Sequence, residues 1–317
     1  METLYFLLQQ TMFFSIPLLV VALGGLFSER SGIINIALEG IMTIGAFAGI
    51  LFINVFENRL SGQMLLLLAV IVAGVAGGLF SLLHAYASIN MKADQTISGT
   101  ALNMLAPAFA IFTARMIFGV QQINFTNTFR ITSVPVLGNI PVLGDLFFKN
   151  TYITTYIGIL IFVISTIVLY KTRFGLRLRA CGEHPQAADS VGINVYRMRY
   201  AGVVISGIYG GIGGLVFVIP TSTNFNATVA GYGFLALAVL IFGQWQPTRV
   251  LFAAMFFGIM KAISATYSGI PLLSAMEIPN TVYKMIPYIA TLVVLAFTSK
   301  NSMAPRAEGI PYDKGAR

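Results

Sequence analysis

The sequence predicts an all-α, polytopic integral membrane protein. Hydrophobic residues make up 57% of the 317 residues and charged residues only 9%, whereas soluble domains carry about 25% charged residues. Nine apolar runs are candidates for membrane-spanning helices, because about 20 helical residues cross the hydrocarbon core. Most lysines and arginines lie between these runs rather than within them. We therefore expect about nine or ten transmembrane helices in one membrane domain, residues 1–298, followed by a tail, residues 299–317.

The candidate spans follow one another along the whole membrane domain. In chain order they are 4–27, 33–56, 64–87, 97–120, 151–170, 200–220, 232–242, 249–267 and 283–298. Two of them are unusual. The run 232–242 is too short to cross unless it is tilted or extended, and the run 33–56 contains Asn35 and Glu39, which makes it a candidate for a broken or re-entrant helix. The number of crossings depends on these two segments.

The basic residues predict the orientation of the spans. Six of the nineteen Lys and Arg residues lie in the polar segment 171–200, and a basic loop between apolar spans is typical of the cytoplasmic side. With that loop inside, alternating spans leave only Arg59, Arg130 and Lys149 in outside loops. The other inside residues are then Arg30, Lys92, Arg249, Lys300, Arg306, Lys314 and Arg317. We therefore expect an outside N-terminus, an external loop at 121–150 and a cytoplasmic tail.

The segment 171–200 contains a short helix with recognisable ends. Pro185 suits the first helical position, and Gly192 suits the position just past the last turn. The residues QAADSV between them form about two turns of helix. A compact helix in a cytoplasmic loop is a feature that a cytoplasmic protein can bind. The sequence therefore indicates a membrane protein that another subunit drives from inside the cell.

Three polar residues within the spans are candidates for a translocation pathway: Asn35, Glu39 and Asn103. Glu39 lies seven residues into its span, and Asn35 is one helical turn earlier on the same face. A carboxylate at such a depth costs several kcal/mol, about 3 by insertion scales, unless it has a partner. Glu39 therefore either faces the transported solute or locks neighbouring helices by accepting hydrogen bonds. Asn103 has the same two interpretations, solute contact or a bridge between helices.

Other residues in the spans have simpler interpretations. Lys261 is expected either to extend its ammonium to the membrane interface or to pair within the protein, and the first is the favoured interpretation. His84 is more typical of a hydrogen-bonded packing residue than of a ligand. The glycines of SGIYGGIGGL, residues 206–215, recur at four-residue spacing. Such a face lets two helices approach closely.

The sequence contains no convincing catalytic, nucleotide-binding or metal-binding motif. No Gly-x-x-x-x-Gly-Lys-Ser/Thr loop for ATP occurs, and we find no Ser/His/Asp set or paired carboxylates. The single cysteine, Cys181, and the two histidines do not have the spacing of metal ligands. Basic residues at the ends of spans indicate topology rather than nucleic-acid binding. We therefore expect no enzymatic activity, no bound cofactor or metal, and an external source of energy for any uphill transport.

Four motifs together resemble one family of membrane proteins. They are GLFSERSGIINIALEGIMTIGAFAG (25–49), TISGTALNML (96–105), GEHPQAADSVGI (182–193) and GYGFLALAVLIFGQWQPT (231–248). They resemble permease subunits of bacterial ABC importers for purine nucleosides and simple sugars. These belong to a superfamily that also holds permeases for ribose and branched-chain amino acids. The likeness covers about residues 25–267 and is greatest to the smaller of two unlike permeases.

The resemblance implies a type II ABC importer permease fold in a bacterial plasma membrane. It also implies a second, longer permease as partner, a cytoplasmic ATPase that uses ATP and Mg²⁺, and an external substrate-binding lipoprotein. This chain would form half of a nucleoside pathway that works by alternating access. Segment 182–193 would couple to the ATPase through Gly182, Glu183, Pro185, Ala187, Ala188, Gly192 and Ile193.

Other functions remain compatible with the residues. An ion-coupled secondary transporter would use Glu39 as its ion or proton site and would need no partner. An ABC permease for a simple sugar or a branched-chain amino acid would share the fold and the partners, and a membrane scaffold or channel would need neither ATP nor its polar residues. The bounded helix at 185–192 favours an ABC permease, because a secondary transporter needs no helix for docking an ATPase.

Overall fold

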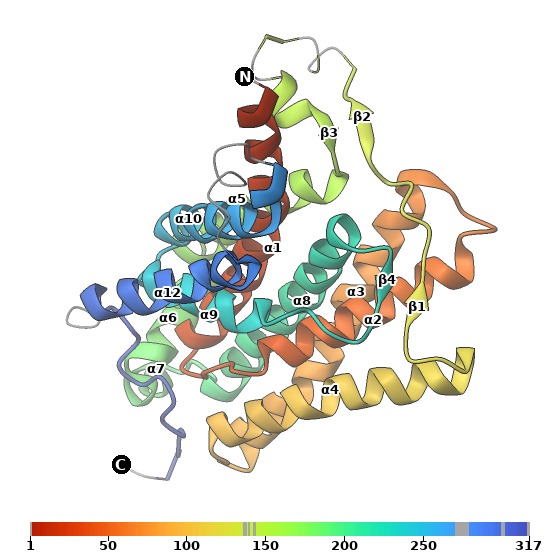
Figure 1. Cartoon of the computed structure of the whole chain (residues 1–317). Helices are drawn as coiled ribbons and strands as arrows, with labels where there is room; N and C mark the ends of the chain where they lie inside the picture. Colours follow the sequence, from red (N-terminus) through yellow and green to blue (C-terminus); the bar gives the residue numbers. More distant parts are fainter. Residues whose placement is uncertain are drawn as a thin grey trace.

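The computed structural model shows a molecule built almost entirely of helices (Figure 1). It describes residues 2–135, 138, 140–141, 144–269, 279–298 and 302–315. The predicted inside residues Lys300 and Arg317 lie outside these ranges.

In the described part of the chain, seven helices are long and apolar enough to cross a membrane. They are α1 (Glu2–Arg30), α2 (Leu38–Phe56), α3 (Gly62–Ala85, continued by a π turn at Tyr86–Asn90), α4 (Gln95–Phe118), α5 (Ile153–Lys171), α8 (Val195–Thr221) and α10 (Pro247–Thr266). The two remaining predicted spans are helical as well, as α9 (Tyr232–Phe242) and α12 (Asn280–Thr298). The all-α, polytopic prediction is confirmed.

The structure differs from the prediction in two helix boundaries and one additional helix. Helix α8 starts at Val195 rather than at 200, because the Asn194 side chain accepts a hydrogen bond from the Arg197 N–H at 3.0 Å and caps it. A helix that we did not predict, α6 (Arg173–Glu183), precedes the predicted short helix and is capped by Thr172. Helix α2 starts only at Leu38, so the predicted span 33–56 begins with a non-helical segment.

Helix α8 occupies the centre of the bundle and packs along α1, α2 and α3. Its glycines allow backbone-to-backbone contact, as the spacing predicted. A Cβ on Gly214 would lie 2.0 Å from the Met42 carbonyl oxygen, and a Cβ on Gly211 would lie 2.2 Å from the Ala73 carbonyl oxygen. The absence of side chains at these positions therefore sets the distance between α8 and both neighbouring helices.

The two ends of the bundle are built differently (Figure 1). At the end with the N-terminus, β2 (Ile131–Ser133) pairs antiparallel with β3 (Lys149–Thr151). A second short ladder joins β1 (Ile123–Asn124) to β4 (Asn224–Phe225), so the loop after α4 is tied to the loop after α8. The other end carries α6, α7 (Pro185–Ser190) and the C-terminus.

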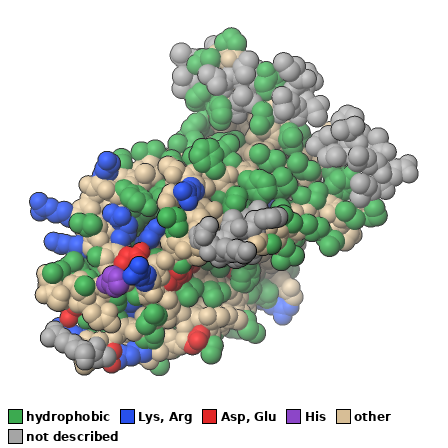
Figure 2. Space-filling view, turned by 90° about the vertical axis from the view of Figure 1, so that its left-hand side faces the viewer, with side chains coloured by type: hydrophobic (Ala, Val, Ile, Leu, Met, Phe, Trp, Pro, Cys, Tyr) green, Lys and Arg blue, Asp and Glu red, His purple; other side chains and the backbone are tan. Residues whose placement is uncertain are grey.

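Basic side chains gather at the end that holds α6, α7 and the C-terminal segment (Figure 2). Lys92 contacts Asp313 of this segment at 2.8 Å. Arg130, one of the three predicted outside residues, instead donates to the Asn150 carbonyl beside the β2–β3 ladder. These described residues thus separate between the two ends as predicted, and the assignment of the basic end to the cytoplasm stays a prediction.

The contact between α3 and α8 predicts the outcome of a paired glycine substitution. Gly211→Ala should destabilise the protein by about 1–3 kcal/mol through overpacking, since its Cβ would meet a carbonyl oxygen. Gly74→Ala, at the same interface, meets only side-chain atoms, of Ile212 at 3.2 Å and of Ile208 at 3.4 Å, and should be tolerated because these side chains can shift. Melting temperatures of both variants in detergent would test this, and equal stability of the two would contradict it.

Candidate functional site

The chain between α1 and α2 is non-helical inside the apolar body of the protein. Backbone N–H and C=O groups there need protein partners, because lipid offers none. The Ser28 hydroxyl donates to the Ile33 carbonyl at 2.7 Å, and His84 Nε2 donates to the Ile34 carbonyl at 2.8 Å. The Gln95 side-chain oxygen accepts from the Ile34 N–H at 2.7 Å. Side chains of α1, α3 and α4 therefore hold this break, and His84 has the packing role that the sequence indicated.

Two predicted pathway residues bind to protein groups along the same break. The Asn103 oxygen accepts from the Gly40 N–H at 2.7 Å, and its amide nitrogen donates to the Ile36 carbonyl at 2.9 Å. The Asn35 amide donates to the Ser206 hydroxyl at 2.8 Å. Both side chains thus bridge helices in this structure, which fits the bridging interpretation of Asn103.

Glu39 joins the first turn of α2 to the start of α9. Its two carboxylate oxygens accept hydrogen bonds from the N–H groups of Gly231 and Gly233, at 2.8 and 2.6 Å. The start of a helix carries free N–H groups and a partial positive charge, so a carboxylate there is stabilising. Gly233 allows the contact, because a Cβ on it would lie 2.4 Å from the Glu39 Cα. The structure therefore gives Glu39 the partners that a locking residue needs.

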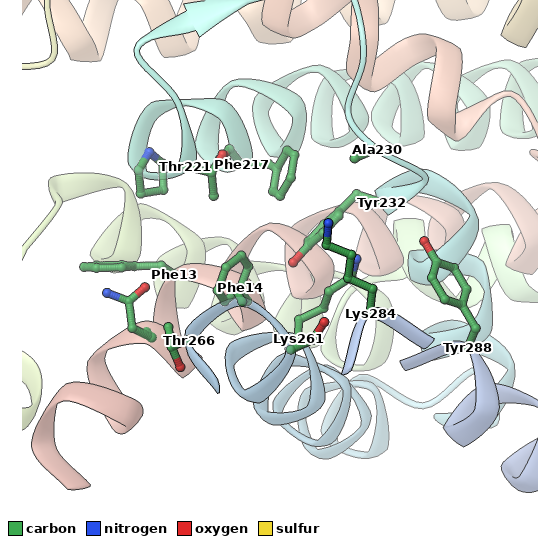
Figure 3. A pocket seen from close by; sticks show the side chains of 14 residues that line it. Phe13, Phe14, Phe217, Thr221, Ala230, Tyr232, Lys261, Thr266, Lys284 and Tyr288 are labelled. Atoms are coloured by element: carbon green, nitrogen blue, oxygen red, sulfur yellow. The ribbon is translucent and has the colours of Figure 1, made fainter. Parts of the chain in front are cut away.

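A cavity of about 480 Å³ lies next to the start of α9, and the three predicted pathway residues do not line it (Figure 3). Its walls come from α1, α8, α9, α10 and α12. The lining includes both aromatic and polar side chains: Gln10, Phe13, Phe14, Phe217, Thr221, Tyr232, Lys261, Ser264, Thr266, Lys284 and Tyr288.

Lys261 is the residue whose position the sequence did not predict. Its ammonium lies over the rings of Tyr232 and Tyr288, 5.3 and 5.5 Å from their centroids, on the wall of the cavity. A lysine inside an apolar helix is itself a sign of a functional position. This was the feature of the sequence that could have marked Lys261 as part of a site. The sequence did not show which helices would surround Lys261.

Helix α7 has the ends that the sequence predicted. Pro185 occupies its first turn, and Gly192 follows it with φ +83°. The Ile193 N–H donates to the Ala188 carbonyl at 3.0 Å, a bond that closes the helix end. The left-handed backbone at Gly192 is the conformation that glycine adopts without steric cost.

The predicted coupling residues lie on two sides of this segment. Gly182, Pro185 and Ala188 are buried, and Ala188 is only 4% exposed. Ala187 and Gly192 are exposed, and so are three neighbours that the prediction omitted: Gln186, Ser190 and Val191. Glu183 and Ile193 are half-buried. The buried residues therefore hold the segment, while the exposed ones form the surface of α7 that a partner could contact.

The C-terminal segment 302–315 is packed onto the base of α7, which the sequence did not indicate. Its Ala307 N–H donates to the Gly182 carbonyl at 2.8 Å, and its Gly309 N–H donates to the Gly32 carbonyl at 3.1 Å. The guanidinium of Arg199, a buried side chain, donates to a further carbonyl of the same segment. The segment thus connects the α6–α7 junction to the end of α1.

A buried polar cluster joins α1 to the turn between α9 and α10. The Arg30 guanidinium contacts the Glu183 carboxylate at 3.5 Å and donates to the Trp245 carbonyl at 2.8 Å. The Trp245 indole N–H donates to the Glu29 carboxylate. Glu308 of the C-terminal segment is hydrogen-bonded to Glu29, and burial raises the pKa of Glu308. The base of α7 is therefore linked through side chains to α1 and to the α9–α10 turn.

Comparison with known proteins identifies the family. The family described as "Branched-chain amino acid transport system / permease component" matches residues 7–295. The chain belongs to this permease family. It is therefore a multi-pass membrane protein and a transport subunit rather than an enzyme.

Two curated relatives match the permease over its full length. The guanosine ABC transporter permease protein NupQ of Bacillus subtilis (strain 168) is 46% identical over 100% of this chain and 99% of its own length. The nucleoside ABC transporter permease protein NupC of Lactococcus lactis subsp. cremoris (strain MG1363) is 42% identical over 99% of this chain and 98% of its own length. The resemblance found in the motifs is thereby confirmed.

A third relative comes from the same Lactococcus strain as NupC. The nucleoside ABC transporter permease protein NupB is 24% identical over 95% of this chain and 82% of its own length. Nucleoside permeases of this family therefore occur as unlike pairs in one organism. No solved structure matches the chain.

The bonds of Glu39 predict that its removal affects folding. Glu39→Ala leaves the N–H groups of Gly231 and Gly233 without their acceptors, and each unsatisfied buried group costs about 1–3 kcal/mol. We expect a lower melting temperature and a lower yield of folded protein in detergent. Thr43→Ala, one turn later on α2, is the control, because the Thr43 hydroxyl bonds only within its own helix. A normal yield of Glu39→Ala together with a changed solute preference would contradict a locking role.

The environment of Cys181 predicts an unreactive thiol. Burial raises its pKa to about 11, so near neutral pH the thiol is protonated and the reactive thiolate is scarce. We expect a maleimide to label the folded protein slowly and the denatured protein at once, as measured by mass spectrometry. Fast labelling of the folded protein would show that Cys181 is accessible.

Proposed function

We propose that this permease is one of two unlike membrane subunits of an ATP-driven nucleoside importer in a bacterial plasma membrane. The observation that carries the proposal is its full-length similarity to two nucleoside permeases, at 46% and 42% identity. Its polar cavity with aromatic walls is compatible with such a solute, which is neutral, aromatic and rich in hydroxyl groups.

The importer requires further subunits. A longer homologous permease would complete the pathway, as the pair NupB and NupC suggests. A cytoplasmic ATPase would bind ATP and Mg²⁺, since the sequence of this chain has no ATP-binding loop. An external lipoprotein would deliver the nucleoside, and this chain itself would bind no cofactor.

Helix α7 would be the contact with the ATPase. Its exposed surface, with small residues at Ala187 and Gly192 and the 75% exposed Val191, suits insertion into a cleft. Its base is held by the C-terminal segment and by the contact between Arg30 and Glu183. A displacement of α7 would therefore reach α1 and the α9–α10 turn and shift the bundle between inward- and outward-open states.

The bonds of Glu39 support this proposal over an ion-coupled secondary transporter. An ion or proton site must exchange its occupant during transport, whereas both oxygens of Glu39 accept backbone N–H groups. The three predicted pathway residues would then have a structural role. Asn35, Glu39 and Asn103 would hold the helices of the pathway in position rather than contact the nucleoside.

Uptake of radiolabelled guanosine and uridine into membrane vesicles tests the proposal. The vesicles contain this chain alone, or this chain with its co-encoded permease and ATPase, each with the lipoprotein supplied outside. ATP-dependent uptake only by the full set is the expected result. Uptake by the chain alone that stops when the ion gradient is dissipated would indicate a secondary transporter instead.

The exposure of Val191 predicts a loss of coupling without a loss of folding. Val191→Asp would place an unpaired charge in the ATPase contact, and we expect ATP-dependent uptake to fall by about tenfold or more. The melting temperature should stay unchanged, because Val191 is 75% exposed. Val191→Thr, which has the same shape and no charge, should transport normally. Undiminished uptake by Val191→Asp would remove α7 from this role.

A further inference from the structure

We propose that the cavity beside the start of α9 holds the base of a 6-oxopurine nucleoside, with Lys261 donating to the O6 and N7 atoms of the base. The inference rests on the proposed nucleoside transport and names a site and a selectivity within it. The cavity is separate from the break that holds Asn35 and Asn103.

The cavity has the size and the walls of a nucleoside site. Its volume of about 480 Å³ lies within the usual range for small-molecule pockets. The rings of Phe217 and Tyr232 stack with centroids 3.9 Å apart, and the ring of Phe14 lies 6.5 Å from that of Tyr232. Aromatic side chains bind nucleobases by stacking. The 52% exposed ring of Tyr288, which also lines the cavity, offers a face for this, whereas the buried rings of Phe217 and Tyr232 stack on each other.

The cavity also presents hydrogen-bond donors that the described residues leave unused. The Tyr232 side chain is only 1% exposed, yet its hydroxyl has no hydrogen-bond partner in the described part of the chain. Such buried groups normally have one. Figure 3 shows Lys261 and Lys284 extending toward Tyr232 from α10 and α12. An ammonium donates three hydrogen bonds and accepts none, so this wall selects a ligand with acceptors.

The pattern of donors favours an oxopurine over an aminopurine such as adenine. Guanine presents N7 and O6 as adjacent acceptors, whereas adenine presents N7 beside the N6 amino donor. An ammonium can donate to both guanine atoms but meets a donor at adenine N6. Thr221, Ser264 and Thr266 also line the cavity. The hydroxyls of Thr221 and Thr266 donate to carbonyls of their own helices, so they can accept hydrogen bonds from the hydroxyls of a ribose.

Glu39 would act as a positioning residue for this site. It fixes the first turn of α9, from which Tyr232 projects, and its charge attracts the ammonium of Lys261. This attraction makes a lysine tolerable within the bundle, because an unbalanced charge there is costly. Glu39 thus holds the first turn of α9 in place without contacting the nucleoside.

The test uses vesicles with the complete set of subunits and the variant Lys261→Cys. The native Cys181 is buried and has a pKa of about 11, so thiol reagents should reach mainly the introduced cysteine. An aminoethyl methanethiosulfonate restores an ammonium at this position, whereas an ethyl methanethiosulfonate adds similar bulk without charge. Initial uptake of guanosine, adenosine and uridine is measured before and after each reagent.

We expect Lys261→Cys to lower guanosine uptake relative to adenosine by about tenfold, the size of one lost charged hydrogen bond. The aminoethyl reagent should restore the preference, and the ethyl reagent should not. Guanosine should also slow modification of the introduced thiol more than uridine does. Arg115→Cys is the matched control, because Arg115 is an exposed basic residue of α4 that lies away from the cavity.

Three results would overturn the inference. An equal fall in uptake of all three nucleosides, with or without loss of folded protein, would mean that Lys261 does not read the base. Protection of the thiol by inorganic phosphate but not by guanosine would mean an anion site. Normal guanosine selectivity in Lys261→Cys would exclude the residue while leaving nucleoside transport intact. A wild-type set that carries no nucleoside refutes the proposed function itself, and with it the site.

Discussion

The architecture depends on one constraint, that every backbone polar group inside the bilayer must find a protein partner. In the described part of the chain, the backbone departs from helix between α1 and α2, where it is mostly buried, and before α9, where buried and exposed residues alternate. Side chains from α1, α3 and α4 satisfy the first departure, and Glu39 satisfies the second by accepting the N–H groups of Gly231 and Gly233. One short stretch around Glu39 therefore fixes the positions of two helix starts, and the packing of α2, α4 and α9 follows from it.

The start of α9 inside the protein has a consequence for the cavity. A helix that begins at depth brings its first residues, including Tyr232, to a wall that α1, α8, α10 and α12 complete. Lys261 of α10 lies over the Tyr232 ring, and the charge of Glu39 attracts its ammonium. The same carboxylate thus connects the stability of the fold with the chemistry that we propose for nucleobase recognition.

The basic end is built differently. There the short, exposed helix α7 is attached to a base that hydrogen bonds hold in place. The outward residues of α7 make few contacts, whereas its inward residues are fixed by the C-terminal segment, by Arg30 and by the turn around Trp245. Rigid attachment lets a short helix transmit a displacement instead of absorbing it. The base contacts α1, the helix whose N-terminal half lines the cavity. We therefore see a continuous set of contacts between the proposed ATPase contact and the proposed solute site.

The sequence by itself determined the features that depend on local chemistry. The lengths of the apolar runs predicted the long helices, and Pro185 and Gly192 predicted the two ends of α7. The isolated carboxylate of Glu39 indicated a position that needed hydrogen-bond partners. The four motifs gave the family. Only the tertiary structure decided which residues share a space: that Ala188 is buried while Val191 is exposed, that the tail binds the Gly182 carbonyl, and that Lys261 lines a cavity. These outcomes rest on contacts between residues far apart in the chain, and such contacts leave no trace in local composition or periodicity.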